Sequence, residues 1–544
     1  MRAFWLAVAV LLGVMALVQV SSVRQESQTF DEAVHLATGY RYWKTGAFEM
    51  NREHPPLQKL LSALPLLVLR PELPAGDPTE DQYKYARAFL YRNRIHADTL
   101  LLAGRLVTIA LTLCLGAAIA WWTAQRYGPG PGLLAVLLYA FEPNVIAHGR
   151  YITTDLIAAL FFFLTCALWS DYLEKPGARR LLWTGLSLGA ALAAKFSMVL
   201  LLPLLALVGL VRRGRLKTLA AYAAVCALAF VTTAAVYAPE TLGLLTGKRE
   251  APPLKDVADR TVSIGYLLKA AGHQLDLPAH SYLLGLQGVA QHNKDGNAAY
   301  LLGRLYEGGD WRYFPVALAV KATTGFLVLL ALSVGAGLWL LVLTRRIDFP
   351  VLVLLAAVLA YFGMSLTSRL NFGVRHLLPI FPLLCVLIAL AAFRAMRWKG
   401  APVLGALLAL AHAGESLAAY PDYVPFFNVA SGGSASGSRY LLDSNLDWGQ
   451  DLKKLKQFVD ERGVTRLCLH YFGMVDPAYY GLDPEYLPKT HDRDERERTD
   501  CYGAVSVTLL HDLYLAPGSY AWLRERTPIA RVGGSIYVYD LRRR

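Results

Sequence analysis

The chain has 544 residues, of which 55% are hydrophobic and only 17% are charged. This composition is too apolar for a soluble enzyme of that length and indicates a polytopic membrane protein. The net charge of +13 comes from short basic clusters between apolar runs, which argues against a nucleic-acid-binding surface.

The chain begins with an apolar run, residues 4–20, that follows Arg2. No small-residue cleavage site of the Ala-x-Ala type comes after it, so we predict a retained membrane anchor rather than a signal peptide. A polar loop, residues 24–99, follows. Within it, Leu57–Leu69 is apolar but too short to span a bilayer, and we expect it to lie on the membrane surface.

Apolar runs of spanning length recur along the next three hundred residues and are interrupted by a second polar loop, residues 239–312. With the first run they predict about eleven membrane spans. The fold class is therefore a polytopic α-helical membrane protein. The runs are 100–124, 132–147, 154–170, 181–194, 196–211, 216–238, 324–344, 349–367, 375–393 and 401–419.

Basic residues cluster in alternating short loops, which fixes the predicted orientation. The positive-inside rule places such loops in the cytoplasm. The N-terminus is then inside, and both long loops and the C-terminal segment are outside. The basic residues are Arg126; Lys175, Arg179 and Arg180; Arg212, Arg213, Arg215 and Lys217; Arg345 and Arg346; and Arg394, Arg397 and Lys399.

The segment 421–544 is not apolar enough to span a membrane, and we predict a soluble extracytoplasmic α/β domain after a membrane domain of residues 1–420. Its predicted helix is Gln450–Arg462. Its predicted strands are Ser438–Asp443, Arg466–Tyr471, Val505–Leu510 and Ser535–Asp540. Cys468 and Cys501 both lie here, and outside the cytoplasm they can pair, although the sequence alone leaves the pairing open.

Charged residues gather on the predicted outer side. Asp31 and Glu32 are adjacent in the first loop, with His35 and His54 nearby, and further charges stand at outer span ends. Each alone is explained by a snorkelling side chain or a helix cap. Their shared depth predicts one outer-face site. The span-end residues are Arg150, Asp155, Lys195, Lys321, Arg375 and His376.

Several motifs in order resemble the polytopic glycosyltransferases of the GT-C fold, in the bacterial branch related to protein O-mannosyltransferases and to the aminoarabinose transferase of lipid A. The resemblance covers most of the chain. The motifs are Asp31-Glu32; His54-Pro55-Pro56-Leu57; Glu142-Pro143-Asn144 through Asp155; Ala194-Lys195-Phe196-Ser197; Trp311 through Lys321, with Tyr313; Asn371-Phe372-Gly373-Val374-Arg375-His376; and Asp443 through Asp451, with Asn445, Asp447 and Trp448.

The resemblance implies sugar transfer from a polyprenyl-phosphate carrier on the outer face of a bacterial cytoplasmic membrane, with inversion at the anomeric carbon. Asp31 matches the position of the catalytic base, and Asp155 matches a second acidic position. Position 54 departs from the pattern, because the aminoarabinose transferases have a lysine there. A cation contacting the donor phosphate at this position therefore requires a protonated His54.

The chemistry of such a transfer assigns further roles. A carboxylate is needed to accept the proton of the acceptor hydroxyl, and cations are needed to stabilise the departing phosphate. We expect Asp31 to be the base, and Glu32 and Asp155 to orient the acceptor or hold a metal. The expected phosphate ligands are His54, Arg150, Lys195, Lys321, Arg375 and His376; the expected substrate or structural residues are Glu142, Tyr313, Asn371, Asp443, Asn445, Asp447 and Trp448.

A divalent cation is not required by this chemistry but has a candidate ligand set. Asp31 and His35 are four residues apart and share a face if the segment is helical, and Asp155 would complete the set. A simple hydrogen bond between Asp31 and His35 is the alternative.

Other interpretations remain open at this stage. The first alternative is a lipid or solute transporter or flippase, but those proteins place ionisable residues near the bilayer midplane. A second is a structural or sensory protein whose outer domain binds glycan. For a transferase, Leu57–Leu69 and Ile264–Leu286 are candidate lids of a groove for the carrier tail, or ordinary interfacial helices. The acceptor hydroxyl belongs to a protein, a lipid or a glycan.

Overall fold

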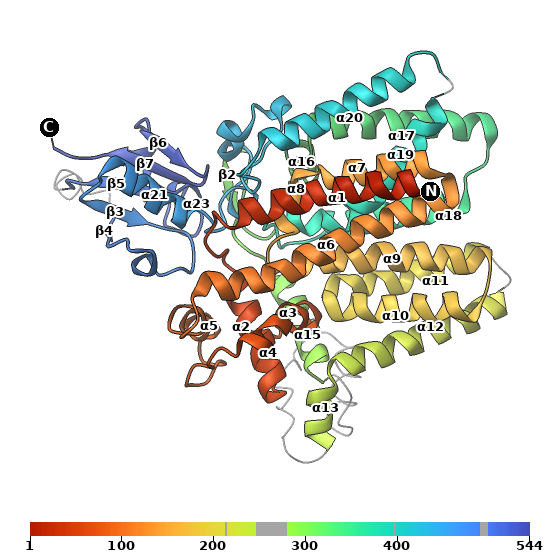
Figure 1. Ribbon diagram of the computed structural model, residues 1–544, viewed down its shortest axis with the longest axis horizontal. Coiled ribbons are helices and arrows are strands. Elements are labelled where there is room, and N and C mark those ends of the chain that lie inside the picture. Colours follow the sequence, from red (N-terminus) through yellow and green to blue (C-terminus); the bar gives the residue numbers. More distant parts are fainter. Residues whose placement is uncertain (213–214, 246–279, 397, 490–498, 544) are drawn as a thin grey trace.

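The computed structural model describes residues 1–212, 215–245, 280–396, 398–489 and 499–543. A bundle of long helices lies with its axes nearly parallel, and a smaller domain containing a β-sheet packs at one end of it (Figure 1). The N-terminus of the first helix lies at the opposite end. Because the bundle surface is apolar, the chain is a multi-pass integral membrane protein.

Eight helices in the described ranges are long and apolar enough to cross a membrane. Three shorter helices pack among them, and together they account for the apolar runs of the sequence. The long helices are α1 (Arg2–Val23), α6 (Ala97–Tyr127), α9 (Thr154–Glu174), α12 (Arg215–Val236), α17 (Thr324–Thr344), α18 (Phe349–Leu366), η2 with α19 (Val374–Ile380 and Phe381–Ala395) and α20 (Ala401–Ala418); the shorter ones are α7 (Pro129–Ala140), α10 (Ala178–Ala194) and η1 with α11 (Phe196–Leu200 and Leu201–Arg212).

One predicted span is interrupted. The run 132–147 was expected to be continuous, but α7 ends at Ala140 and the short helix α8 spans Pro143–His148. Pro143 has no amide proton for a continuing helix, and the Glu142 carboxylate accepts a hydrogen bond from the Asn144 amide at 3.4 Å. The break turns the chain at the end of the bundle where the C-terminal domain packs.

The first loop folds into four helices on the same end of the bundle, α2 (Glu32–Thr45), α3 (Leu57–Ser62), α4 (Leu64–Leu69) and α5 (Gln82–Tyr91). The prediction of one amphipathic helix over Leu57–Leu69 was wrong, because it is divided at Ala63. Gly39 allows α2 to cross α3 closely, since a Cβ at Gly39 would lie 2.0 Å from the Lys59 carbonyl oxygen.

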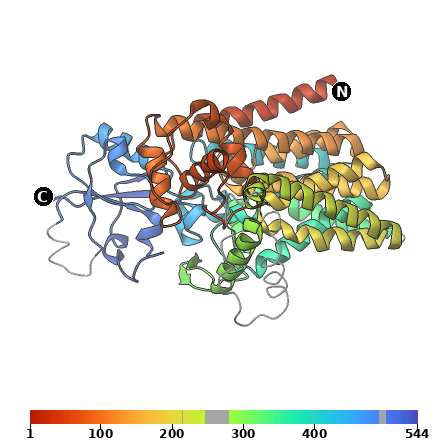
Figure 2. The same ribbon diagram turned by 90° about the horizontal axis from the view of Figure 1, so that it is seen from below.

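Elements that follow α12 complete this end of the molecule. They are α13 (Ala238–Leu245), α15 (His280–Asp295), the hairpin β1 (Ala299–Leu301) and β2 (Arg304–Tyr306), and α16 (Tyr313–Lys321). Most of the predicted helix Ile264–Leu286 lies outside the described residues. Figures 1 and 2 both show α15 beside the helices of the first loop.

The C-terminal domain has a five-stranded mixed sheet in the order β4-β3-β5-β7-β6. β3 is parallel to β4 and β5, and β7 is antiparallel to β5 and β6. The elements are η3 (Val429–Ser431), η4 (Ser434–Arg439), η5 (Asp443–Asn445), α21 (Leu452–Arg462), β3 (Leu467–His470), η6 (Pro477–Tyr480), β4 (Glu485–Tyr486), β5 (Tyr502–Ser506), α23 (Val507–Leu510), α24 (Ala521–Arg524), β6 (Ala530–Val532) and β7 (Ile536–Asp540).

Two of the four predicted strands of this domain are confirmed and two are not. β3 and β7 lie where they were predicted. Ser438–Asp443 is not a strand, because Leu441 and Leu442 are buried as the chain runs between two 3₁₀ turns, and Asp443 has a positive φ of 56°. Val505–Leu510 is divided between the end of β5 and α23. Cys468 and Cys501 form a disulfide that joins β3 to the start of β5.

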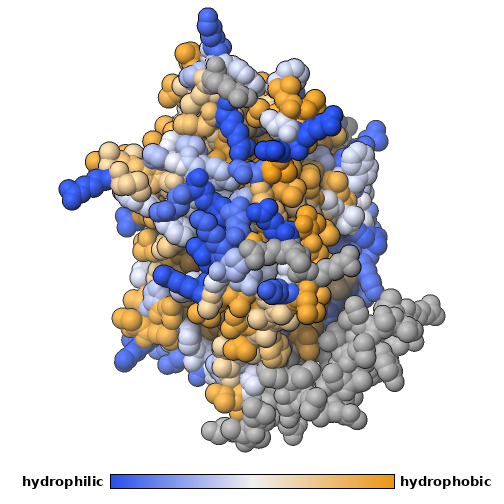
Figure 3. All heavy atoms as spheres, turned by 90° about the vertical axis from the view of Figure 1, so that its right-hand side faces the viewer, coloured by the Kyte–Doolittle hydropathy of each residue, from blue (hydrophilic) through white to orange (hydrophobic). Residues whose placement is uncertain are grey.

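The end of the bundle remote from the C-terminal domain is the more basic one. Figure 3 looks onto this end, where hydrophilic side chains gather amid apolar ones. It includes the turns between the long helices, with Arg345 and Arg346 between α17 and α18, both exposed. The first loop, α15 and the sheet domain all lie at the other end (Figure 2).

Candidate active site

Four charged side chains from distant parts of the sequence meet where the first loop, the bundle and the C-terminal domain join. Arg375 Nη1 lies 3.1 Å from Asp31 Oδ2 and 3.6 Å from Asp155 Oδ2. Lys195 forms an ion pair with the other oxygen of Asp155. We call Asp31, Asp155, Lys195 and Arg375 the charged cluster. Asp31 is its most exposed member, at 22%, whereas Asp155 is 2% exposed.

The helix ends explain how these groups come to the same depth. Asp31 is the residue before α2, Asp155 is in the first turn of α9, and Lys195 directly follows α10. A carboxylate in the first turn of a helix is stabilised by the helix dipole. Arg375 is the second residue of η2, which follows Gly373, where a Cβ would lie 2.3 Å from Ser444 Oγ. The glycine therefore lets the Arg375 segment approach the C-terminal domain.

The C-terminal domain covers the cluster with an aromatic ring. The Arg375 guanidinium lies 4.3 Å from the centre of the Trp448 ring, a favourable cation–π contact. Trp448 also contacts the rings of His148 and Tyr151, at 5.7 and 5.9 Å. Asp443 accepts a hydrogen bond from Tyr514, and burial raises the pKa of the Asp443 carboxyl to about 6.

Two histidines of the first loop form a pair beside the cluster. The rings of His35 and His54 are 5.1 Å apart, and His35 Nδ1 lies 2.7 Å from the Ile152 carbonyl oxygen. Burial, together with His35 and the nearby cations of Lys59, Lys195 and Arg375, lowers the pKa of His54 well below 6.5. His54 is therefore neutral near pH 7 and offers a hydrogen bond rather than a positive charge.

His376 lies next to Arg375 among aromatic rings. Its ring is 6.3 Å from that of Phe314 and 6.0 Å from that of Phe372. It therefore belongs to the wall of the site.

Three of the expected site residues are bound to buried protein partners and do not join the charged cluster. They are Glu32, Arg150 and Lys321. Glu32 pairs with Arg105 at 2.6 Å and also accepts bonds from the amides of Thr29 and Ile152. Arg150 pairs with Glu26 at 2.7 Å and is fully buried. Lys321 donates to three backbone carbonyls, those of Val424, Phe426 and Asn445, and so has no proton left for a ligand.

The remaining expected residues mostly brace the scaffold around the cluster. Glu142 binds Asn144, whose amide in turn donates to the Lys321 carbonyl. Tyr313 accepts a bond from Asn445 at 2.9 Å. Asn371 accepts bonds from the Tyr306 hydroxyl and the Asp310 amide, and Asp447 accepts them from the amides of Gly449 and Thr508.

The candidate metal ligands do not converge. His35 Nδ1 is bound to the Ile152 carbonyl, and Asp31 is turned towards Arg375. In the described ranges, no group of three or more His, Cys, Asp or Glu side chains is arranged to hold a metal ion.

Two partners of the expected site residues were not predicted from the sequence, the acidic Glu26 and the aromatic Tyr514. Glu26 neutralises Arg150 and binds the Tyr151 hydroxyl at 2.7 Å, and Tyr514 binds Asp443. Glu26 lies just after the first apolar run, where a buried carboxylate is unusual and signals a buried partner. Nothing in the sequence around Tyr514 points to Asp443, which is 71 residues away.

The chain is similar to known proteins in part of its sequence and in its fold. Residues 94–238 match the family described as dolichyl-phosphate-mannose-protein mannosyltransferase. The structure of ArnT from Cupriavidus metallidurans bound to undecaprenyl phosphate is similar over 99% of both chains, with 11% identity and a TM-score of 0.50. No curated protein matches the sequence.

Two other solved structures are similar with lower scores. The archaeal oligosaccharyltransferase AglB from Archaeoglobus fulgidus has 12% identity and a TM-score of 0.49, over 99% of this chain and 74% of that one. The S. cerevisiae protein O-mannosyltransferase complex bound to its sugar donor has 17% identity and a TM-score of 0.36, over 44% and 34%.

The fold is that of a polytopic membrane protein with a mixed-sheet domain at the C-terminus, and over its whole length it is similar to the fold of ArnT. More particularly, residues 94–238 are similar in sequence to the dolichyl-phosphate-mannose-protein mannosyltransferase family.

Proposed function

We propose that this protein transfers a sugar, with inversion, from a polyprenyl-phosphate carrier to a hydroxyl group on the outer face of the cytoplasmic membrane. The observation that carries the proposal is the charged cluster. It combines an accessible carboxylate with two cations, at one end of a membrane bundle. The family match and the ArnT-like fold support a lipid-linked donor.

In this proposal Asp31 is the catalytic base. It is the most exposed carboxylate of the cluster, and it stands in the first loop, where an acceptor can reach it. The acceptor oxygen attacks the anomeric carbon while its proton moves to Asp31. The bond between the anomeric carbon and the phosphate oxygen breaks, and the electron pair leaves with the polyprenyl phosphate.

Lys195 and Arg375 are the proposed ligands of the departing phosphate. Both are cationic, partly buried and held by Asp155, which is 2% exposed and so acts as a fixed counter-charge. Fixed cations in a site from which water is largely excluded stabilise developing negative charge strongly. His54 and His376 adjoin this place as hydrogen-bonding groups. Arg150 is paired with Glu26, and Lys321 donates its protons to backbone carbonyls, so we give both residues supporting roles only.

The proposed location on the outer face rests on two features. The site lies at the end of the bundle opposite to the basic turns, which the positive-inside rule assigns to the cytoplasm. The same end carries the Cys468–Cys501 disulfide, a bond typical of extracytoplasmic compartments.

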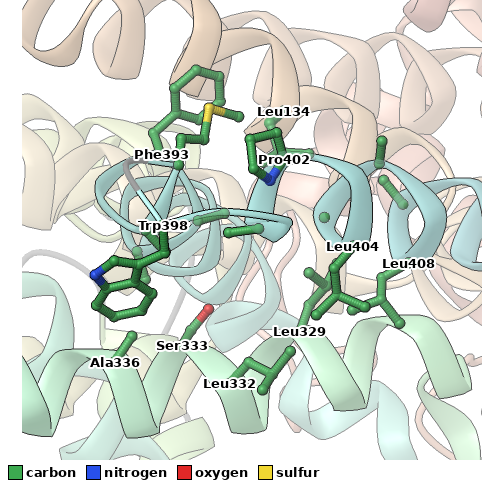
Figure 4. Close-up of a pocket in the computed structure, with 18 of the residues that line it drawn as sticks. Leu134, Leu329, Leu332, Ser333, Ala336, Phe393, Trp398, Pro402, Leu404 and Leu408 are labelled. Atoms are coloured by element: carbon green, nitrogen blue, oxygen red, sulfur yellow. The ribbon is translucent and has the colours of Figure 1, made fainter.

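An apolar groove of about 840 Å³ lies elsewhere, between α7, α17, α19 and α20 (Figure 4). Its walls include Leu134, Leu332, Phe393 and Trp398, near the end of the bundle remote from Asp31. We assign it to the surface that faces bilayer lipid and not to the reacting centre.

The test is the release of free polyprenyl phosphate from a panel of polyprenyl-phosphate sugars, with purified protein in lipid and an envelope extract as the acceptor source. We expect release by the wild type and a fall of about 10²–10⁴ in rate for Asp31→Asn. Glu72→Gln is the matched control, because Glu72 is an exposed acid of the same loop, 75% exposed. It is expected to leave the rate unchanged.

Two results would contradict the proposal. Undiminished release by folded Asp31→Asn would remove Asp31 as the base. Absence of release by the wild type with every donor would favour a transporter.

A further inference from the structure

A second cavity, of about 690 Å³, lies between the first loop and α15, outside the charged cluster. This volume falls within the range of about 300–1,000 Å³ that is usual for small-molecule sites. One wall is the segment from Glu49 to Glu53, another is the segment from Pro78 to Tyr83, and the third is the face of α15 that includes His292. Gly285 lets α15 approach closely, since a Cβ there would lie 2.2 Å from the Arg52 carbonyl oxygen.

Each wall of this cavity is connected to a residue that adjoins the charged cluster or the histidine pair. The Tyr83 ring lies 5.6 Å from the ring of Phe30, the residue before Asp31. On the opposite wall, His292 contacts Phe372 at 6.2 Å, and Phe372 contacts His376 at 6.0 Å. The third connection is covalent, because Glu53 precedes His54 in the chain. The cavity walls therefore contact residues that neighbour Asp31, His54 and Arg375 in the chain.

The cavity differs from the cluster in its charge. The cluster contributes the two cations proposed to hold a phosphate. The cavity is lined by four carboxylates and one guanidinium. These groups are Glu49, Glu53, Glu80, Asp81 and Arg52. Glu49 pairs with Arg41 at 3.1 Å, and the other three carboxylates still outnumber the Arg52 guanidinium, so the lining repels anions.

The wall segment contains a buried polar side chain, Asn51, that links its two acidic parts. Asn51 is 9% exposed, and its amide nitrogen binds Glu53 and Gln82. Its side-chain oxygen accepts no hydrogen bond from the part of the protein that the structure describes. A buried carbonyl without a donor is costly, so the Asn51 segment is held in place at the expense of an unsatisfied acceptor.

A row of partly exposed aromatic rings extends from the cavity across Asp31. Phe30 stacks on Phe472 at 5.6 Å, and Phe472 stacks on Tyr514 at 5.6 Å. With Tyr83 they form a continuous apolar surface flanked by carboxylates. Flat apolar rings beside hydrogen-bond acceptors suit a sugar, which has an apolar ring face and hydroxyl donors at its edge.

We propose that this cavity binds the acceptor, and that the acceptor is an uncharged or amino-bearing carbohydrate rather than an anionic one. The inference rests on the proposed function, since it names the acceptor class of that reaction. In this arrangement the donor phosphate is attracted to Lys195 and Arg375, and the acceptor is held on the opposite side of Asp31 by carboxylates and aromatic rings. The carboxylates of the cavity thereby repel the donor phosphate, and the cations of the cluster repel an amino-bearing acceptor.

Binding of three trisaccharides to the full-length protein in lipid nanodiscs tests this inference. The probes are triacetylchitotriose, which is neutral, chitotriose, which is cationic, and trigalacturonate, which is anionic; saturation-transfer NMR gives each dissociation constant. We expect trigalacturonate to bind at least about fivefold more weakly than the other two at low salt, and the difference to shrink in about 0.5 M salt.

Variants of the cavity charge make the test specific. Glu53→Gln combined with Glu80→Gln is expected to bring the three constants within about twofold of each other. Glu72→Gln, an exposed acid outside the cavity, is expected to leave the order unchanged. Equal binding of trigalacturonate by the wild type, no binding of any probe, or an unchanged order in the double variant would each overturn the inference.

The Asp31→Asn variant separates this inference from the proposed function. It is expected to bind the neutral and cationic probes while releasing polyprenyl phosphate about 10²–10⁴ more slowly than the wild type. If the wild type binds the probes in the expected order but never uses a lipid-linked donor, the proposed transfer fails and the carbohydrate site stands. If transfer occurs but the cavity shows no charge preference, the transfer stands and this inference fails.

Discussion

At the scale of single residues, two adjacent carboxylates have opposite environments. Asp31 is partly exposed and faces Arg375, whereas Glu32 is fully buried and held by Arg105 and two backbone amides. Successive residues of a helix point about 100° apart, so one of them faces the site and the other faces the loop core. From the sequence, Asp31 was expected to be the base and Glu32 to orient the acceptor, but the sequence did not identify Arg105 as the partner of Glu32.

Glu32→Gln should therefore lower stability rather than chemistry. Removing one partner of a buried ion pair leaves the other charge uncompensated and costs about 3–5 kcal/mol. We expect a clearly lower unfolding temperature for Glu32→Gln in detergent, and little change for Asp31→Asn. The release assay on the folded fraction supplies the second readout. A Glu32→Gln protein with wild-type stability and no transfer would show that Glu32 belongs to the catalytic machinery.

Acid should destabilise the first loop through its histidine pair. Burial lowers the pKa of His35, and it lowers that of His54 well below 6.5, so both are neutral in the folded protein. In the unfolded chain their pKa is near 6.5, so as the pH falls below about 6.5 the unfolded state takes up protons first. Stability is thus fully present above about pH 6.5 and is lost as the pH falls towards the lowered folded values.

The measurement is the unfolding temperature between about pH 7.5 and 5. We expect a smaller decrease for His54→Gln than for the wild type, because glutamine keeps hydrogen bonding without taking up a proton. An equally steep decrease in His54→Gln would assign the acid sensitivity to other groups.

At the scale of helices and strands, sequence patterns located most spans closely. Runs such as 324–344 and 349–367 match α17 and α18 within a residue, because eighteen or more apolar residues have one stable arrangement in a bilayer. The interruption at Phe141–Glu142 was missed because a proline-initiated short helix preserves the apolar character of the run. The strand predicted at Ser438–Asp443 was wrong, because Leu441 and Leu442 are apolar in order to pack into the main hydrophobic core and not to pair in a sheet.

The disulfide should contribute much of the stability of the C-terminal sheet. It joins positions 33 residues apart, and closing a loop of that size stabilises a fold by about 3–4 kcal/mol in the chain-entropy model. We expect a thiol reductant to lower the unfolding temperature of the wild type. The double variant Cys468→Ser/Cys501→Ser should unfold at the lower temperature with or without reductant. Cys226→Ser, which removes a free thiol of α12, should behave as the wild type does. An unchanged wild-type transition under reductant would show that this bond carries little of the stability.

At the scale of the whole molecule, the site is assembled from segments hundreds of residues apart. Arg375 and Asp31 are 344 positions apart, and Trp448 comes from a third region. The sequence predicted the common depth of Asp31, Asp155, Lys195 and Arg375, because spans and loop sides follow from hydropathy and charge. Which cations meet those carboxylates depends on lateral packing of helices, which hydropathy does not encode. Arg150 and Lys321 therefore appeared equivalent to Arg375, although the fold pairs them elsewhere.

The orientation of the whole molecule is open to a direct prediction. The first loop, the charged cluster and the sheet domain lie at one end, and the basic turns lie at the other. Positive turns are retained in the cytoplasm, so the sheet domain should face outwards. We expect a membrane-impermeant maleimide to label Glu461→Cys, at the exposed end of α21, in intact cells. Arg346→Cys, in the turn between α17 and α18, should be labelled only after the membrane is opened. Labelling of Arg346→Cys alone in intact cells would invert the protein and place the charged cluster in the cytoplasm, where a donor on the outer leaflet could not reach it.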